Sequence, residues 1–300
     1  MKEFSFFSTF SGIGGFELGI EQAAKKHKIN AKCIGFSEVD PYAISVYKKN
    51  FQGVKNYGDI TKINTKEIPD FDCLVGGSPC QDISVIGKRA GIKGDKSILF
   101  FEYLRILEEK KPKFFVWENV KGILSSNNGK DFETVLSSFE KLGYSMQWSI
   151  LDSRFFGSPQ HRERIIIIGF LGEERPSKIL PIYGNKLKTA LNDKCIIALG
   201  KRRTKASTHN YINTITASYH GPYGDGAPGV VANRKIRKLT PIECERCQLF
   251  PDNWTKYGED GKPISDSQRY KMCGNAVCVG IIKEVFNELF NHINSKETTK

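Results

Sequence analysis

Hydrophobic and polar positions along the chain predict alternating strands and helices. Short apolar runs are followed by stretches in which apolar residues recur every three or four positions. In residues 98–110, for example, Leu99, Tyr103, Ile106 and Leu107 fall on one helical face. This repetition favours a mostly parallel sheet with helices on both faces. The predicted strands are residues 4–10, 31–37, 72–77, 113–117, 144–151 and 164–171, with another ending at 58–61. The predicted helices are residues 16–27, 42–50, 98–110, 131–142, a segment beginning at Thr240, and 276–290.

The pattern changes after Leu171. Residues 172–236 are rich in Gly, Pro, Asn, Thr and Lys and contain no convincing helix. Residues 220–229 have the composition of a loop. We therefore expect an α/β domain over residues 1–171, a small loop-rich domain over 172–271, and a C-terminal helix over 272–300 that returns to the first domain. The end of the small domain is not fixed by the pattern, because residues 237–252 resemble a hinge-like helix.

Composition and charge narrow the class of protein. Of 300 residues, 39% are hydrophobic and 26% are charged, which excludes wholesale disorder and a collagen-like repeat. The formal net charge of +12 favours a polyanionic partner, although a lysine-rich surface that contacts only solvent would give the same net charge. The longest apolar run, 165–171, is too short to span a bilayer, and the N-terminal apolar run is interpreted as a first strand rather than a signal peptide. We therefore expect a cytoplasmic protein without a membrane segment.

The cysteines do not indicate a metal site. Eight are present, and without a secretory signal we expect no disulfides. Cys244 and Cys247 have zinc-like spacing, but Cys273 and Cys278 are separated by four residues and no histidine lies near either pair. Structural zinc sites usually have tighter paired spacing, so we expect no metal.

A glycine-rich turn follows the first predicted strand, in the segment Phe10-Ser11-Gly12-Ile13-Gly14-Gly15. Glycines there let a ligand approach the backbone, and the following helix N-terminus favours negative charge. Glu38 ends the second strand, where a carboxylate accepts hydrogen bonds from ribose hydroxyls. Asp59 ends another predicted strand and is placed to accept a hydrogen bond from an adenine amino group. Either acid alone also fits a helix cap or a solvated charge. Together they predict an adenosine-containing cofactor, and the missing GxGxxG pattern disfavours a nicotinamide dehydrogenase.

Three later segments place reactive side chains at the same sheet edge. Cys80 follows a buried strand within Gly76-Gly77-Ser78-Pro79-Cys80-Gln81, a position that suits a nucleophile but also a buried structural cysteine. Glu118 emerges at this edge and is suited to act as an acid toward a heterocycle. Arg162 and Arg164 fall on one side of an extended chain, where they would orient the carboxyl group and bind a carbonyl oxygen. A surface charge run gives the same arginine pattern.

In their order, these blocks resemble the cytosine-5 DNA methyltransferase family, and the resemblance covers nearly the whole chain outside residues 172–236. The blocks are FSGIGGF, Glu38, GDIT, GGSPCQ, ENV, QHRER, RKLTPIECERCQLFPD at 237–252, and GNAV at 274–277. The resemblance implies a Rossmann-like methyltransferase sheet with helices on both faces, plus a small target-recognition domain. It implies methyl transfer from S-adenosylmethionine to carbon 5 of cytosine in a specific DNA sequence.

The same resemblance implies a covalent mechanism on a flipped-out base. Cys80 would attack carbon 6 of the cytosine, which makes carbon 5 able to take the methyl group. Glu118 would hydrogen-bond ring nitrogen 3 and the exocyclic amine. Arg164 would contact the base carbonyl, Arg162 would support Glu118 and the base, and Asn119 would help to hold the pocket.

Cofactor and DNA contacts are also implied by the resemblance. Phe10 would lie against the adenine, Asp59 and Ile60 would frame it, Glu38 would hold the ribose, and Asn275 would close the methionine end. Val39 stands where many members have an aromatic residue. The implied cofactor contacts are Phe10, Gly12, Ile13, Gly14, Gly15, Glu38, Val39, Asp59, Ile60, Pro79, Asn275 and Ala276. The implied DNA contacts are Lys88 and Arg89 in a catalytic loop, and Lys201, Arg202, Arg203, Lys205 and Thr216 in the recognition domain.

Two related functions remain as alternatives. One is methylation of cytosine in tRNA, but the Pro-Pro-Cys-Gln-Pro-Phe-Thr block typical of that branch is absent. The other is a DNA-binding relative that has lost catalysis. This alternative is disfavoured because Cys80, Glu118 and Arg164 are all present. For the main interpretation we expect a monomer that acts on double-stranded DNA within a restriction-modification system.

Overall fold

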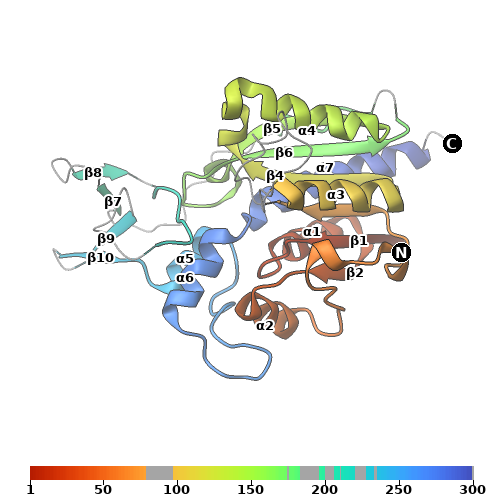
Figure 1. The fold of residues 1–300 in the computed structure, drawn as a ribbon. Coiled ribbons are helices and arrows are strands. Elements are labelled where there is room, and N and C mark those ends of the chain that lie inside the picture. The colour runs from red at the N-terminus through yellow and green to blue at the C-terminus, as the bar shows by residue number, and fades with distance from the viewer. Residues whose placement is uncertain are drawn as a thin grey trace.

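The computed structural model describes residues 1–78, 97–173, 176–182, 196–199, 206–209, 211–219, 228–232 and 235–298. The strands of the main sheet are β1 (Lys2–Thr9), β2 (Ile29–Ser37), β3 (Cys73–Gly76), β4 (Phe114–Val120), β5 (Tyr144–Asp152) and β6 (Glu163–Leu171). They lie in the order β2-β1-β3-β4-β6-β5, and only β6 runs antiparallel to its neighbours (Figure 1). The predicted α/β class with a mostly parallel sheet is confirmed.

Helices cover both faces of this sheet. One face is covered by α1 (Gly15–His27) and α7 (Val279–Thr298), and the other by α3 (Ser97–Lys110) and α4 (Lys130–Lys141). The remaining helices are α2 (Pro41–Asn50), α5 (Pro241–Cys247) and α6 (Asp266–Asn275). In β4, Phe114 and Val116 join one core with α1 and α7, whereas Phe115 and Trp117 join the other with α3 and α4. Because both faces are buried, the strand has a continuous apolar run instead of alternation.

Short capping sequences start helices near the carboxyl ends of the parallel strands. Gly14 has φ +86° between β1 and α1, a conformation that favours glycine. Asp40 precedes Pro41 and accepts hydrogen bonds from the backbone N–H groups of Tyr42 and Ala43, which begins α2 directly after β2. Strand ends and helix starts therefore meet along one edge of the sheet.

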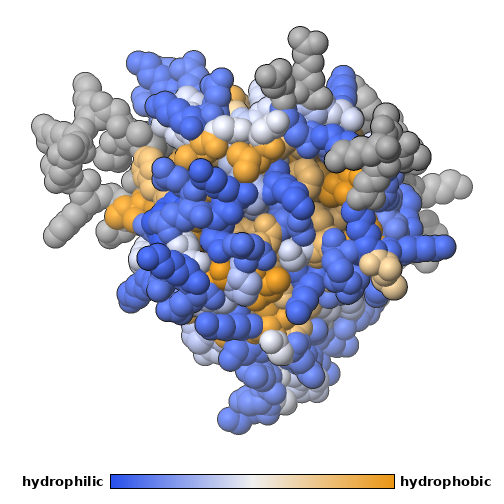
Figure 2. All heavy atoms as spheres, turned by 90° about the vertical axis from the view of Figure 1, so that its right-hand side faces the viewer, coloured by the Kyte–Doolittle hydropathy of each residue, from blue (hydrophilic) through white to orange (hydrophobic). Residues whose placement is uncertain are grey.

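The C-terminal helix α7 packs along α1 on one face of the sheet (Figure 1). Phe286 and Phe290 of α7 contact the ring of Phe4 in β1, with ring centroids 6.1 and 5.1 Å from it. Figure 2 looks onto the side where β1 begins, and there hydrophilic side chains surround scattered hydrophobic ones. The strand ends that form the site described below lie at the other end of the strands.

One prediction of local structure was wrong, and two features were not predicted. Residues 172–238 contain four short strands in the described ranges: β7 (Ile196–Leu199), β8 (Ala206–His209), β9 (Pro228–Ala232) and β10 (Lys235–Lys238). They pair in the order β10-β9-β7-β8. Residues 58–61 do not end a strand, because only an isolated bridge joins Asn56 to Phe36 before the short 3-10 helix Ile60–Lys62. Helix α6 was not predicted, since its buried face includes the charged Arg269.

A buried acid in α1 makes stability depend on pH. Burial raises the pKa of Glu17 from an ordinary 4.5 to about 7, and a hydrogen bond from the Tyr47 hydroxyl at 3.0 Å only partly opposes this. The unfolded chain therefore releases this proton near pH 4.5 and the folded chain near pH 7. Between these values the free energy of unfolding falls as pH rises, by about 3 kcal/mol in total.

Glu17→Gln is expected to remove this slope and to be the more stable protein at pH 8, as measured by urea unfolding at pH 5 and pH 8. Glu140→Gln, on the exposed face of α4, is the control and should leave the slope unchanged. An unaltered pH dependence in Glu17→Gln would show that other groups cause it.

Candidate active site

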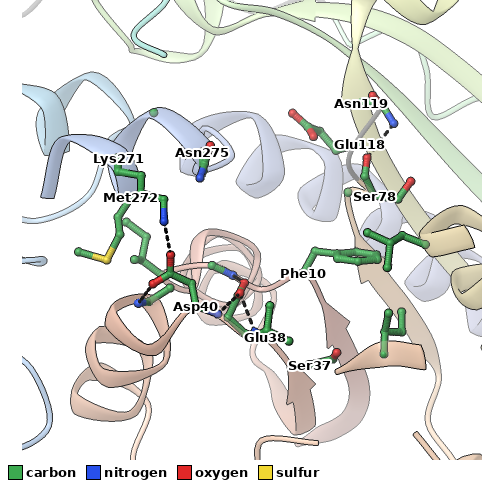
Figure 3. A pocket seen from close by; sticks show the side chains of 18 of the residues that line it. Phe10, Ser37, Glu38, Asp40, Ser78, Glu118, Asn119, Lys271, Met272 and Asn275 are labelled. Carbon is green, nitrogen blue, oxygen red and sulfur yellow. Dashed lines mark hydrogen bonds and ion pairs between the residues drawn. The ribbon is translucent and has the colours of Figure 1, made fainter. Parts of the chain in front are cut away.

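A cavity of about 680 Å³ lies at the carboxyl edge of the parallel strands, between them and α6 (Figure 3). It is lined by the residues that follow β1, β2 and β3, by the last residues of β4, by Asp59 and Ile60, by the start of β6, and by the end of α6. The predicted site residues that line it are Phe10, Gly12, Ile13, Glu38, Val39, Asp59, Ile60, Glu118, Asn119, Arg162, Arg164 and Asn275. The topology thus brings predicted residues from six separate segments to one place.

Glu38 organises one end of this cavity. Its carboxylate accepts hydrogen bonds from the backbone N–H groups of Gly12 at 2.8 Å, Val39 at 2.8 Å and Asp40 at 2.9 Å. These bonds tie the glycine-rich turn to the end of β2. A carboxylate has about four acceptor positions, so this arrangement leaves capacity for a ligand hydroxyl.

Asp59 faces the cavity but also caps a helix. Its Oδ1 accepts hydrogen bonds from the backbone N–H of Thr61 at 3.0 Å and the Thr61 hydroxyl at 2.8 Å. These bonds hold its pKa below the usual range. Beside it lie the apolar side chains of Phe10, Ile60 and Val39, and Val39 is 65% exposed. An exposed apolar side chain in a cavity wall suits contact with a flat apolar ligand.

Three predicted cofactor residues do not line the cavity: Gly14, Gly15 and Ala276. A Cβ atom at Gly14 would lie 2.2 Å from the ring of Phe51, and one at Gly15 would lie 2.7 Å from Val277. The structure therefore gives both glycines a packing role. Ala276 is buried, and its carbonyl accepts a hydrogen bond from Arg162.

Glu118 and Arg164 form a mostly buried ion pair at the opposite end. The Nε of Arg164 lies 3.0 Å from Oε1 of Glu118, and both side chains are mostly buried. Gly77 packs closely here, because a Cβ at this position would lie 2.8 Å from Oε2 of Glu118. A charged pair in a partly dry cavity interacts more strongly than it would in water.

The neighbouring Asn119 holds the chain after β3. Its Nδ2 donates to the carbonyl of Ser78 at 3.1 Å, and the Ser78 hydroxyl accepts from the indole of Trp117 at 3.2 Å. Ser78 lines the cavity two positions before Cys80 in the sequence. The sequence analysis placed Gly77 and Ser78 in the segment before Cys80 but gave neither a role in the site.

Arg162 lines the cavity, and its hydrogen bonds join the cavity wall to distant backbone segments. Its guanidinium donates to the backbone carbonyls of Ile215 at 3.1 Å, Gly274 at 3.1 Å and Ala276 at 3.0 Å. Burial, and then the nearby Arg164, lower the pKa of Arg162 to about 9, so it remains cationic at neutral pH. The ion-pair partner of Glu118 is Arg164, and Arg162 instead joins three segments of backbone.

Thr216, a predicted DNA contact, is exposed and follows Ile215, whose carbonyl accepts a hydrogen bond from Arg162. Its hydroxyl lies 3.2 Å from that of Ser218, and its backbone passes close to α6. A Cβ at Gly274 would lie 2.3 Å from the Thr216 carbonyl carbon. Glycine at 274 therefore allows the recognition segment to pack on α6.

Several predicted residues lie outside the described residues. They are Pro79, Cys80, Lys88, Arg89, Lys201, Arg202, Arg203 and Lys205. Within the described ranges, no group of three His, Cys, Asp or Glu side chains is placed to hold a metal ion. No helix in the same ranges has the length and apolar character needed to cross a membrane. Cys244, Cys247 and Cys273 pack there in an apolar cluster, and burial raises the pKa of all three thiols.

Comparison with known proteins identifies the family. The model of the C-5 cytosine-specific DNA methylases matches residues 4–220 and 194–291. Type II methyltransferase M1.ScrFI of Lactococcus lactis subsp. cremoris is 37% identical over 93% of this chain and 76% of that protein. Type II methyltransferase M.HhaI of Haemophilus parahaemolyticus is 31% identical over 97% of this chain and 95% of that protein. The chain belongs to the C-5 cytosine-specific DNA methylases.

Solved structures agree with the fold of this methylase. The Entamoeba histolytica methyltransferase EhMeth superposes with a TM-score of 0.73 at 21% identity and covers 98% of this chain and 99% of its own. S. pombe Dnmt2 methyltransferase gives 0.70 at 18% identity, over 98% of this chain and 99% of its own. At these identities the likeness supports the fold alone. The methylase is thus a DNA cytosine-5 methyltransferase by family, built on a Rossmann-like sheet.

Sequence reasoning missed two further features of the methylase site. Lys271 lines the cavity from α6, and its Nζ lies 2.6 Å from Oδ2 of Asp40. The indole of Trp254 donates a hydrogen bond of 2.9 Å to the carbonyl of Ile13 in the glycine-rich turn. Neither position belongs to a regular sequence pattern, although a tryptophan in an otherwise polar loop was a signal of close packing.

Proposed function

We propose that the protein transfers a methyl group from S-adenosylmethionine to carbon 5 of cytosine in a specific duplex DNA sequence, through a covalent Cys80 adduct on a flipped-out base. The observation that carries the proposal is the division of one cavity into two ends. Glu38 and the glycine-rich turn form one end, and the Glu118–Arg164 pair forms the other. Methyl transfer requires a donor site and an acceptor site that open into the same space.

The donor end suits the proposed cofactor. Phe10, Val39 and Ile60 provide apolar walls for an adenine, and Asp59 is placed to accept from its amino group. Glu38 retains acceptor capacity for ribose hydroxyls, and Asn275 lies on the α6 side, toward the methionine end (Figure 3). When bound there, the cofactor supplies an electrophilic methyl group. The role proposed for these residues is to bind it and to direct that group toward Glu118.

The acceptor end suits a cytosine ring. Glu118 presents its carboxyl group to the ring, sharing a proton with nitrogen 3 and accepting a hydrogen bond from the exocyclic amine, and Arg164 presents a guanidinium to the ring carbonyl. The Cys80 thiolate forms a bond to carbon 6, and carbon 5 then takes the methyl group as its bond to the donor sulfur breaks, which leaves a neutral thioether. Loss of the carbon 5 proton to water and cleavage of the sulfur–carbon 6 bond release the methylated base and regenerate the thiolate.

DNA contacts and domain roles complete the proposal. Lys88 and Arg89 would meet phosphates near the target base, and Lys201, Arg202, Arg203 and Lys205 would position the duplex. Thr216 lies where the recognition segment packs on α6. Residues 1–171 would form the catalytic domain, 172–271 the recognition domain and 272–300 the returning helix. The protein would act as a monomer in the cytoplasm, within a restriction-modification system. The family model and the curated relatives give the tRNA alternative no support.

Two linked experiments test the proposal. Bisulfite sequencing of DNA from cells that express the protein should show one cytosine protected within one short sequence, and none in cells with the empty vector. A duplex with 5-fluorocytosine at that position should then form a covalent adduct in the presence of S-adenosylmethionine, because fluorine does not leave as the proton does. No protected cytosine, or no adduct with cofactor present, would refute the mechanism.

Trp254 is expected to support cofactor binding from behind the glycine-rich turn. Its loop is held by the fully buried Glu245, which accepts from Asn253 N–H at 2.7 Å, Thr255 N–H at 2.8 Å and Arg269 at 3.0 Å. Trp254→Phe keeps the ring contacts but removes the bond to the turn. Since a neutral hydrogen bond is worth about 1 kcal/mol net, the Kd for S-adenosylhomocysteine should rise about fivefold.

Isothermal titration calorimetry measures this change. Trp148→Phe is the matched control, because Trp148 lies exposed on the edge strand β5 and does not line the cavity. Equal affinities in Trp254→Phe and the wild type would mean that the turn holds its shape without the indole.

A further inference from the structure

Lys271 is the one cavity-lining cation in the described ranges that is bound neither to backbone carbonyls nor to the catalytic acid. The other two cations in the wall are Arg162, which donates to three carbonyls, and Arg164, which pairs with Glu118. Lys271 is half-exposed, and its ammonium group contacts Asp40. An ammonium has three donors, so this contact leaves capacity for a second anion.

Asp40 fixes the position of this ammonium group. Its Oδ1 accepts from the N–H groups of Tyr42 and Ala43 at the start of α2, and its Oδ2 lies 2.6 Å from Nζ of Lys271. The carboxylate is thus held by the helix on one side and holds the lysine on the other. A flexible lysine loses rotamer entropy when it binds a ligand, and part of that cost is met before the ligand arrives.

The position of Lys271 relates it to the anionic end of the proposed cofactor. Lys271 and Asn275 lie one turn apart on α6, facing Glu38 and Asp40 across the cavity, whereas Glu118 lies at the far end (Figure 3). In S-adenosylmethionine, the methyl, ribose and amino-acid groups all branch from one sulfur. With the methyl directed to Glu118 and the ribose at Glu38, the amino-acid chain extends along α6.

We propose that the Lys271 ammonium binds the α-carboxylate of the methyl donor, and that Asp40 is a positioning residue for it. This inference rests on the proposed function, because it requires S-adenosylmethionine as the donor. In this arrangement, each end of the cavity carries a charge opposite to that of the nearer ligand group. The Lys271 cation would face the carboxylate, and the Glu118 anion would lie nearer the sulfonium.

The test removes the lysine charge and the ligand carboxylate separately and together. Calorimetry gives the Kd of S-adenosylhomocysteine and of its decarboxylated analogue for the wild type, Lys271→Met and Lys271→Arg. In the wild type, the carboxylate should strengthen binding about 10- to 100-fold, the range for a charge-assisted hydrogen bond. In Lys271→Met the ratio should fall to about threefold or less, and Lys271→Arg should keep most of it.

Two further variants test the role of Asp40 in holding Lys271 and control for the loss of a positive charge. Asp40→Asn removes the tether but keeps the ammonium, so the carboxylate-dependent ratio should fall only partly, to a value between those of the wild type and Lys271→Met. Lys283→Met, on the exposed side of α7, controls for loss of a positive charge and should change neither Kd.

The outcomes distinguish the inference from the proposed function. If Lys271→Met weakens both ligands equally, or keeps the wild-type ratio, Lys271 does not bind the carboxylate and the inference is overturned while the cofactor stands. If the wild type binds neither ligand, the proposed cofactor itself is overturned.

Discussion

Cys80→Ser is expected to abolish methyl transfer, with kcat lower by at least about 10⁴-fold, the scale seen when a covalent nucleophile is removed. A serine hydroxyl ionises far less readily than a thiol, and it would not form the bond to carbon 6. Binding of DNA and cofactor should persist, because Glu118, Arg164 and the residues around Glu38 are unchanged. Incorporation of labelled methyl groups in single turnovers measures the loss, and fluorescence anisotropy measures DNA binding.

The other described cysteines are not suited to replace Cys80 as the nucleophile. In the part of the chain that the structure describes, six other cysteines occur, and none of them lines the cavity. Burial raises the pKa of each, which disfavours the thiolate that attack requires. Cys33→Ser is the matched control and should retain turnover. Undiminished turnover in Cys80→Ser would remove Cys80 from the mechanism.

The main fold was predictable because its core pattern is strong. The strands of the large sheet are apolar runs buried on both faces, and the helices between them have clear apolar faces. The small sheet lacked this signal: β7, β8 and β10 each have only four residues, and the segments around them are rich in glycine and lysine. Helix α6 was missed because Arg269 is buried through its ion pair with Glu245, a contact 24 positions away that no local pattern reveals.

The site was predictable as a set of residues but not as a set of contacts. Strand ends of a parallel sheet meet at one edge, which is why Glu38 and Glu118 face one space. Asp59 faces the same space from the start of a short 3-10 helix and not from a strand end. The different contacts of the two arginines have a local cause. β6 begins at Glu163, so only Arg164 belongs to the strand and follows its alternation. Arg162 precedes the strand and turns toward the carbonyls of Ile215, Gly274 and Ala276, which come from distant segments.

Glu118→Gln is expected to lower kcat by about 10²- to 10³-fold, in the range for loss of a positioned acid or a charged stabilising group. The side chains have nearly the same shape, so the effect reports the charge. An amide at this position pairs weakly with Arg164 and has no carboxyl proton to share with ring nitrogen 3, where addition of the thiolate to carbon 6 develops negative charge. The Kd of S-adenosylhomocysteine should stay within about twofold of the wild type, because the cofactor end of the cavity is unchanged.

Single-turnover methylation and calorimetry separate these two effects. Glu163→Gln is the control, since Glu163 pairs with Lys121 outside the cavity and should retain turnover. Because Glu118 and Arg164 act as a pair, Arg164→Met in the Glu118→Gln background should cost much less than it does alone. Additive losses in that cycle would mean that the two side chains contribute independently. Wild-type turnover in Glu118→Gln would exclude the carboxylate from the chemistry.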